Sequence, residues 1–99
     1  MSKVHWTGRA LARLDAIQVH IAEHNPDAAL RIVHAIVRRS TQIKVFPHSG
    51  RRVADYARDD VRELIEGNYR IVYRVLPTQI DVVAVMHTSQ LLPTDLQKL

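Results

Sequence analysis

The chain of 99 residues contains no cysteine. A disulfide bond and a thiolate metal site are therefore excluded, and the absence fits a reducing compartment without establishing one. Apolar residues never run for the roughly 20 positions that a membrane-spanning helix needs, and the first ten residues, MSKVHWTGRA, lack the apolar run of a signal peptide. We therefore expect a cytoplasmic protein that has no membrane partner and needs no cofactor.

Glycine and lysine are also scarce. Of the three glycines, Gly50 has no second glycine near it, so no phosphate-binding loop is indicated. Lysine is greatly outnumbered by arginine, and the net charge is +4. Arginine makes planar contacts with carboxylate and phosphate, so the surface suits an acidic protein, nucleic acid or a ribonucleoprotein, although it also fits a mildly basic protein with no such partner. With 46% hydrophobic and 24% charged residues, we expect one folded domain over residues 1–99.

The first half of the chain predicts a short strand and two helices. Residues 3–6 form the strand candidate, in which Trp6 is expected to be a core anchor. Thr7 can cap a helix from Gly8 to about residue 24, and Asn25 with Pro26 can start a second helix that Pro47 ends. Apolar residues recur at helical spacing in both segments: Ala10, Leu14, Ile17 and Ile21, then Ala29, Ile32, Val33, Ile36, Val37 and Ile43. Two helices joined so tightly should form an antiparallel hairpin.

After Gly50 the pattern changes to the alternation of strands. Strands are predicted at 51–54, 61–66, 69–76 and 80–86, with a type II′ turn at Gly67-Asn68. The last strand is almost entirely apolar, so it should be central and buried on both faces. Residues 55–60 are expected to be a loop, and the C-terminal residues a short helix or docked segment. The predicted fold is α+β, with an N-terminal strand and a helical hairpin packed on one face of a mainly antiparallel sheet (β-α-α-β-β-β).

The two-residue turn fixes the register of the hairpin 61–76 and therefore the face of each side chain. Leu64, Ile71, Tyr73 and Val75 should face the helices. The opposite face should be open, and it places Glu63 diagonally to both Arg70 and Arg74, within reach of ion pairing. This face is then either a solvated charged surface or a surface that awaits a partner.

Four stretches in this order resemble the RelE/ParE toxin superfamily of type II toxin–antitoxin modules: VHWTGRALARLDAI, FPHSGRRV, RELIEGNYRIVYRV and IDVVAVMHT. The resemblance extends from Val4 to about Pro93. It implies the β-α-α-β-β-β fold and an antitoxin whose C-terminal segment wraps around the toxin. It also implies one of two activities, because RelE-like members cut mRNA on the ribosome whereas ParE-like members inhibit DNA gyrase.

The residues that the resemblance assigns to RNA cleavage are mostly missing. The RelE-like pattern has two lysines before the hairpin turn, an arginine after the hairpin tyrosine, a later arginine and a tyrosine in the tail. Here those positions hold Val61, Glu63, Arg70, Gln90 and a residue near Leu96, so only Arg70 matches. A second nuclease pattern leaves Glu63, Arg70 and His87 as a conceivable catalytic set, but His87 is displaced by one residue, which turns a strand side chain to the other face.

We therefore expect a ParE-like toxin that needs no catalytic residue. DNA gyrase is the expected target, and contact with it is expected at residues 55–60 and 88–99. An acidic antitoxin is expected to lie along the open sheet face and the groove of the helical hairpin, and its expected contacts on the sheet are Val61, Glu63, Ile65, Arg70, Val72 and Arg74. An mRNA endonuclease acting with the ribosome, and an interaction module without toxicity, remain as alternatives.

Two further patterns predict little chemistry. His20 and His24 have the i, i+4 spacing of metal ligands, but no third ligand is apparent, so solvated histidines are the better interpretation. Ser49 and Ser89 lie near histidines in the sequence, but neither has the surrounding pattern of a hydrolase nucleophile.

Overall fold

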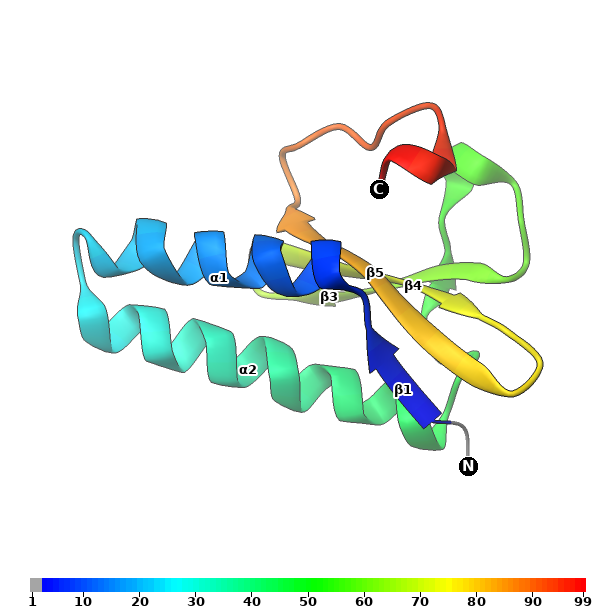
Figure 1. Cartoon of the computed structure of the whole chain (residues 1–99), viewed down its shortest axis with the longest axis horizontal. Helices are drawn as coiled ribbons and strands as arrows, with labels where there is room; N and C mark the ends of the chain where they lie inside the picture. The colour runs from blue at the N-terminus through cyan, green and yellow to red at the C-terminus, as the bar shows by residue number, and fades with distance from the viewer. Residues whose placement is uncertain (1–2) are drawn as a thin grey trace.

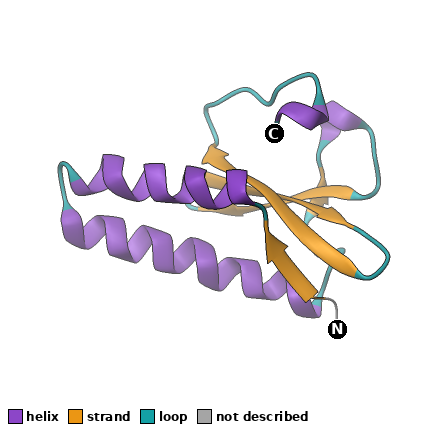
Figure 2. Ribbon diagram, viewed as in Figure 1, coloured by secondary structure: helices purple, strands orange, loops and turns teal. Residues whose placement is uncertain are grey.

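The computed structural model describes residues 3–99 (Figure 1). The helical hairpin lies along one side of a five-stranded sheet, and the C-terminal segment arches over the other side (Figure 2). The predicted α+β fold and element order are confirmed. The elements are β1 (Lys3–Trp6), α1 (Gly8–Ala22), α2 (Pro26–Val45), β2 (Arg51–Arg52), the short 3-10 helix η1 (Ala54–Tyr56), β3 (Val61–Glu66), β4 (Tyr69–Val75), β5 (Gln79–His87) and a second 3-10 helix, η2 (Leu96–Lys98).

Both helices begin at the caps that the sequence predicts. The hydroxyl of Thr7 accepts a hydrogen bond from the amide of Ala10 at 3.1 Å, and the side-chain oxygen of Asn25 accepts one from Ala28 at 3.0 Å. Each bond satisfies an amide that has no partner within the helix. Because only three residues separate α1 from α2, the two helices lie side by side and run antiparallel (Figure 1). Neither is both long and apolar enough to cross a membrane, in a search of residues 3–99.

The strand order is β1-β5-β4-β3-β2. β1 runs parallel to β5, and the other neighbours are antiparallel. The β3–β4 register is the predicted one, with Leu64 opposite Ile71. Gly67 has a φ of 58°, whereas Asn68 has no positive φ, which is the pattern of a II′ turn. β2 is only two residues long, shorter than the predicted strand, because the chain turns into η1 directly after Val53.

A β-bulge interrupts the β4–β5 pairing. Val72 pairs with Ala84 and Tyr73 with Val82, so Val83 is the extra residue. The bulge puts Val82 and Val85 in the same core although they are three residues apart. Ala84 belongs to a different core on the other face. β5 is thus buried on both faces, as predicted, although it lies next to the edge strand β1 and not in the middle of the sheet.

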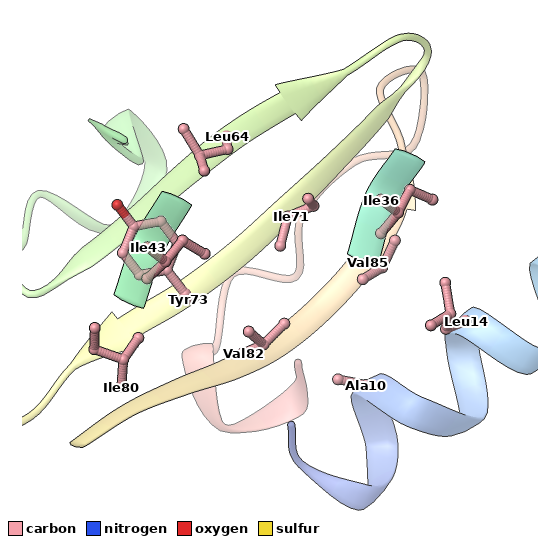
Figure 3. Packing of buried hydrophobic residues seen from close by; sticks show 10 residues of the cluster. All are labelled: Ala10, Leu14, Ile36, Ile43, Leu64, Ile71, Tyr73, Ile80, Val82 and Val85. Carbon is pink, nitrogen blue, oxygen red and sulfur yellow. The ribbon is translucent and has the colours of Figure 1, made fainter. Parts of the chain in front are cut away.

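The larger core lies between the helices and the sheet (Figure 3). Trp6 packs against its edge while remaining partly exposed. The faces predicted for the hairpin side chains are confirmed here, since Leu64, Ile71 and Tyr73 all point toward the helices. The buried members are Ala10 and Leu14 from α1, Ile36 and Ile43 from α2, and Leu64, Ile71, Tyr73, Ile80, Val82 and Val85 from the sheet.

A second, smaller core occupies the sheet face that was predicted from the sequence to be open. Val61 and Val72 are fully buried there, and Leu99 from the C-terminal segment packs with them. Tyr56 of η1 fixes the segment by donating a hydrogen bond to the carbonyl of Pro93 at 2.8 Å. The expectation of an open face is therefore wrong, because apolar side chains of residues 88–99 cover it. The C-terminal residues were expected to form either a short helix or a docked segment, and they do both, since the segment docks on the sheet and ends in η2.

Candidate binding surfaces

The Glu63 carboxylate is the charged group held most deeply within the sheet. Its side chain is 5% exposed and lies on the face covered by the C-terminal segment. Arg51 Nε donates to one carboxylate oxygen at 2.8 Å, and Arg70 Nη1 donates to the other at 3.4 Å. The diagonal contact between Glu63 and Arg70 is thus as predicted. The contact from Arg51 could not be predicted from the sequence, because it depends on the pairing of the short strand β2 with β3, in which Arg51 faces Glu63.

Arg74 does not pair with Glu63, and that expectation is wrong. Its Nε donates to the carboxylate of Asp60 at 3.0 Å, and Arg58 binds the same carboxylate through two nitrogens. The hydrogen bond from Arg58 is the main reason that the pKa of Asp60 lies below its usual range. Asp60 directly precedes Val61, the residue that lies opposite Arg74 in the β3–β4 register. Arg74 therefore pairs with Asp60 and not with Glu63.

His87 lies on the opposite face of the sheet from Glu63 and Arg70. In β5 it pairs with Tyr69, which faces the helices, and the two rings meet edge to face at 5.5 Å. Arg70 is the next residue of β4, so its side chain points to the other side. The conceivable nuclease set of Glu63, Arg70 and His87 is consequently not brought together by the fold.

The predicted antitoxin surface is only partly accessible. Val61 and Val72 are fully buried, and Glu63 is nearly so. Ile65, Arg70 and Arg74 keep some exposure. A partner could touch all six residues only after the C-terminal segment had moved away, so contact with the buried three is not available in this conformation.

A cavity of about 780 Å³ lies on the helix side between α1 and the ends of β4 and β5. We call it the α1–β5 groove. Arg13 lines it, and the Nη1 atom of Arg13 is buried with no hydrogen-bond partner in the described part of the chain. Such a donor is costly to leave unsatisfied. The apolar residues that line the groove include Ile17, Ile21 and Val85, and its polar lining residues include Arg13, His20, His24, Tyr69, His87 and Gln90.

The three histidines of this groove do not form a metal site. The rings of His20 and His24 meet edge to face with their centres 6.2 Å apart. Over residues 3–99, no three histidine or acidic side chains are grouped so that they could hold a metal ion. Sequence reasoning noticed the histidine pair but missed the groove, because only tertiary packing brings Tyr69 and His87 against α1.

The sequence and the fold are similar to those of proteins from toxin–antitoxin systems. The profile described as "ParE toxin of type II toxin-antitoxin system, parDE" matches residues 4–92. A solved structure titled "Chromosomal ParDE TA system from P. aeruginosa" superposes with a TM-score of 0.73 at 27% identity, covering 88% of this chain and 96% of that one.

Two curated proteins are similar over nearly their whole length. Y4kP of Sinorhizobium fredii is 36% identical over 95 residues, which is 92% of this chain and 93% of that protein. Toxin RelE2 of Caulobacter vibrioides is 33% identical over 92 residues, which is 92% of this chain and all of that protein. The chain belongs to the ParE toxin family of type II toxin–antitoxin systems.

Proposed function

We propose that this toxin inhibits DNA gyrase by binding to it as a protein, that it does not cleave RNA, and that a cognate acidic antitoxin neutralises it. One observation carries the proposal against RNA cleavage: Arg70 is bound to the buried Glu63 carboxylate. Arg70 is the only side chain that matches the RelE-like nuclease pattern.

Phosphodiester cleavage by a ribose 2′-oxygen needs positive charge beside the phosphate as well as an acid and a base. Here the Glu63 carboxylate would repel a phosphate and already engages both Arg51 and Arg70. The carbonyl of Thr88 also accepts a hydrogen bond from Arg70 at 3.4 Å, which places the start of the C-terminal segment over the guanidinium. These contacts leave little room for an RNA backbone at Arg70.

The comparisons support the gyrase target without deciding it. The family profile and the solved structure both carry the ParDE name, whereas the relative from Caulobacter vibrioides is named RelE2. That name is the observation that keeps a ribosome-dependent endonuclease as the second candidate function.

Two assays on purified toxin separate the candidates. The first measures supercoiling of relaxed plasmid by gyrase, and the second maps cuts in mRNA on translating ribosomes. We expect inhibition of supercoiling and intact mRNA. Cuts at codon-defined positions with normal supercoiling would overturn the proposal in favour of the nuclease, and inactivity in both assays would favour an interaction module without toxicity.

We place the main antitoxin contact in the α1–β5 groove, because the sheet face expected for it is occupied by residues 88–99. The groove combines an apolar wall at Ile17, Ile21 and Val85 with the unpartnered Nη1 of Arg13. An amphipathic antitoxin segment would bury apolar side chains against this wall. A carboxylate of the same segment would supply the hydrogen-bond acceptor that Arg13 lacks.

The contact is tested with Arg13→Gln, and Arg31→Gln serves as the matched control because Arg31 is an exposed arginine of α2. Affinity for the antitoxin encoded beside the toxin gene is measured by calorimetry. We expect Arg13→Gln to weaken binding by about tenfold, the order of one charge-assisted hydrogen bond, and the control to leave it unchanged. Equal affinities for the wild type and Arg13→Gln would remove the groove as the antitoxin site.

A further inference from the structure

Histidines gather beside an arginine in the α1–β5 groove. Arg13, His20, His24 and His87 all line it, whereas no aspartate or glutamate does so among residues 3–99. Three of the six histidines of the chain therefore lie at one surface whose lining has no carboxylate. Histidine is the side chain whose ordinary change of charge falls between pH 5 and 8. The positive charge of this groove therefore rises as the pH falls through that range.

The basic groups of α1 mark two ends of one stripe along the helix. Arg13 and His20 are seven residues apart, which is two turns, so they lie on the same side of α1 and are separated by about 10 Å along its axis. The apolar side chains of Ile17 and Ile21 line the same groove. His24 lies just past the end of the helix, and its ring meets that of His20 edge to face with the centres 6.2 Å apart. The groove thus offers a guanidinium and, two turns away, a pair of imidazoles.

Both ends of this stripe lack a carboxylate partner within the described residues. Arg13 Nη1 is buried without a hydrogen bond. His5 illustrates an internal pair in this protein, because its Nδ1 lies 3.3 Å from the carboxylate of Asp81. Neither His20 nor His24 makes such a contact in residues 3–99. Both ends of the stripe are therefore available to carboxylates of a partner.

The charged groups of neighbouring elements do not occupy the histidine pair. Glu23 and Asp27 are the acidic residues nearest to it in the sequence, and both are exposed and do not line the groove. On the sheet, Glu66 lies opposite Tyr69 in the β3–β4 register, and its carboxylate is 3.9 Å from Arg39. A partner's carboxylate would therefore meet no acidic side chain in the lining of the groove.

His87, on the β5 side of the groove, contacts uncharged groups. The amide of Ser89 donates to its Nδ1 at 3.1 Å, so the neutral ring carries its proton on Nε2. Its ring also meets that of Tyr69 edge to face. We therefore assign the change of charge on binding to His20 and His24.

We propose that the antitoxin segment in the α1–β5 groove presents two carboxylates, one to Arg13 and one to the His20–His24 pair, and that its binding takes up protons from solvent onto that pair. This inference rests on the placement of the antitoxin in the groove under the proposed function. A carboxylate beside an imidazole favours the protonated ring, so the complex holds more protons than the two free proteins do. The affinity should therefore be higher at pH 6 than at pH 8.

The test compares the variant His20→Gln/His24→Gln with the control His34→Gln/His48→Gln, which removes two exposed histidines that do not line the groove. Affinity for the antitoxin encoded beside the toxin gene is measured by calorimetry at pH 8, 7 and 6. Between pH 8 and pH 6, we expect the affinity of the control to rise at least about fivefold more than that of the groove variant. Titratable groups of the antitoxin itself contribute equally to both, and equal rises would overturn the proposal.

Proton uptake is measured directly from the heat of binding at pH 7 in phosphate and in Tris, two buffers that differ in their enthalpy of ionisation. The control should take up about half a proton more per complex than the groove variant does. A merely structural role of the two histidines would change the affinity at every pH and leave this number the same. Equal proton uptake would therefore count against the proposed contact.

The variant Arg13→Gln separates the failure of this inference from the failure of the proposed antitoxin site. If Arg13→Gln weakens binding while the groove variant and its control show the same dependence on pH, the histidine contact is wrong and the groove remains the site. If neither change alters binding, the placement of the antitoxin in the groove fails as well. Inhibition of gyrase is measured on the toxin alone and is decided independently.

Folding is checked by thermal melting, which should be unchanged because His20 and His24 are exposed. If the groove variant is unfolded, nuclear magnetic resonance on the wild type replaces it. The imidazole signals of His20 and His24 should titrate at higher pH in the complex than in the free toxin, and those of His34 and His48 at the same pH in both. Equal midpoints for His20 and His24 in the two states would overturn the proposal.

Discussion

Arg51 Nε lies 2.8 Å from the carboxylate of Glu63, although Arg51 is 70% exposed and Glu63 only 5%. This ion pair links the edge strand β2 to β3, and in it the positive charge of the exposed Arg51 neutralises the buried carboxylate of Glu63. Arg70, 17% exposed, completes the ion-pair cluster from the other side. The stability of this sheet face therefore depends on a carboxylate that sequence reasoning placed in solvent.

Replacing Glu63 with Gln should destabilise the protein by about 2–3 kcal/mol, because the partly buried guanidinium of Arg70 would lose its ionic partner. Urea unfolding followed by circular dichroism measures the change. Glu66→Gln is the matched control, since Glu66 is 35% exposed and lies 3.9 Å from Arg39. The control should change the free energy of unfolding by less than about 1 kcal/mol. Equal effects of the two changes would show that Glu63 is not held as described.

Replacing Tyr73 with Phe should cost about 1–3 kcal/mol. The hydroxyl of Tyr73 donates to the carbonyl of Pro47 at 2.7 Å and accepts from the amide of Gly50 at 2.9 Å. Without it, both backbone groups of the turn before β2 lose a buried partner. Chemical denaturation reports the loss, and Tyr69→Phe is the control, because Tyr69 makes no such hydrogen bond within residues 3–99. A free energy of unfolding equal to that of the wild type would contradict this account of the turn.

Gly50→Ala should be more damaging than any other glycine substitution in the chain. A Cβ at this position would lie 2.5 Å from the hydroxyl of Tyr73 and 2.7 Å from the backbone oxygen of Glu63, and the second atom cannot move without disturbing the sheet. We expect a loss of at least about 2 kcal/mol, as for other overpacked sites. Gly8→Ala, at a helical position with no atom within 4 Å, should be neutral or stabilising. Thermal melting of the two variants measures the difference in stability, and equal melting temperatures would contradict the close packing described at Gly50.

Asp60 should make stability depend on pH in the acid range. Its pKa in the folded protein is lowered, chiefly by the hydrogen bond from Arg58. A depressed carboxyl pKa stabilises the folded state above the unfolded pKa of about 4 and ceases to do so as the pH falls through the folded value. The wild type should therefore exceed Asp60→Asn in stability at pH 7, by less than about 1 kcal/mol, because the Asp60 side chain is 31% exposed and solvent partly screens its ion pairs. The difference should shrink toward zero below pH 4, and a difference that stays constant with pH would contradict the assignment.

Local patterns in the sequence were enough to predict the elements and much of the core. Thr7 and Asn25 start helices because capping depends only on neighbouring residues. The Gly67-Asn68 turn sets the β3–β4 register, and the register assigns Leu64 and Ile71 to the helix side. The Glu63–Arg70 contact follows from the same register, because it lies within one hairpin.

Contacts between distant parts of the chain could not be predicted in this way. The sequence by itself determined the α+β fold, the face of each hairpin side chain and the absence of most of the nuclease pattern, since these depend on spacing within short segments. Only the tertiary structure decided that residues 88–99 cover the second sheet face, that Arg74 pairs with Asp60, and that Arg51 binds Glu63. Each of these depends on packing that joins separate segments, and alternation along one strand carries no information about what lies over it.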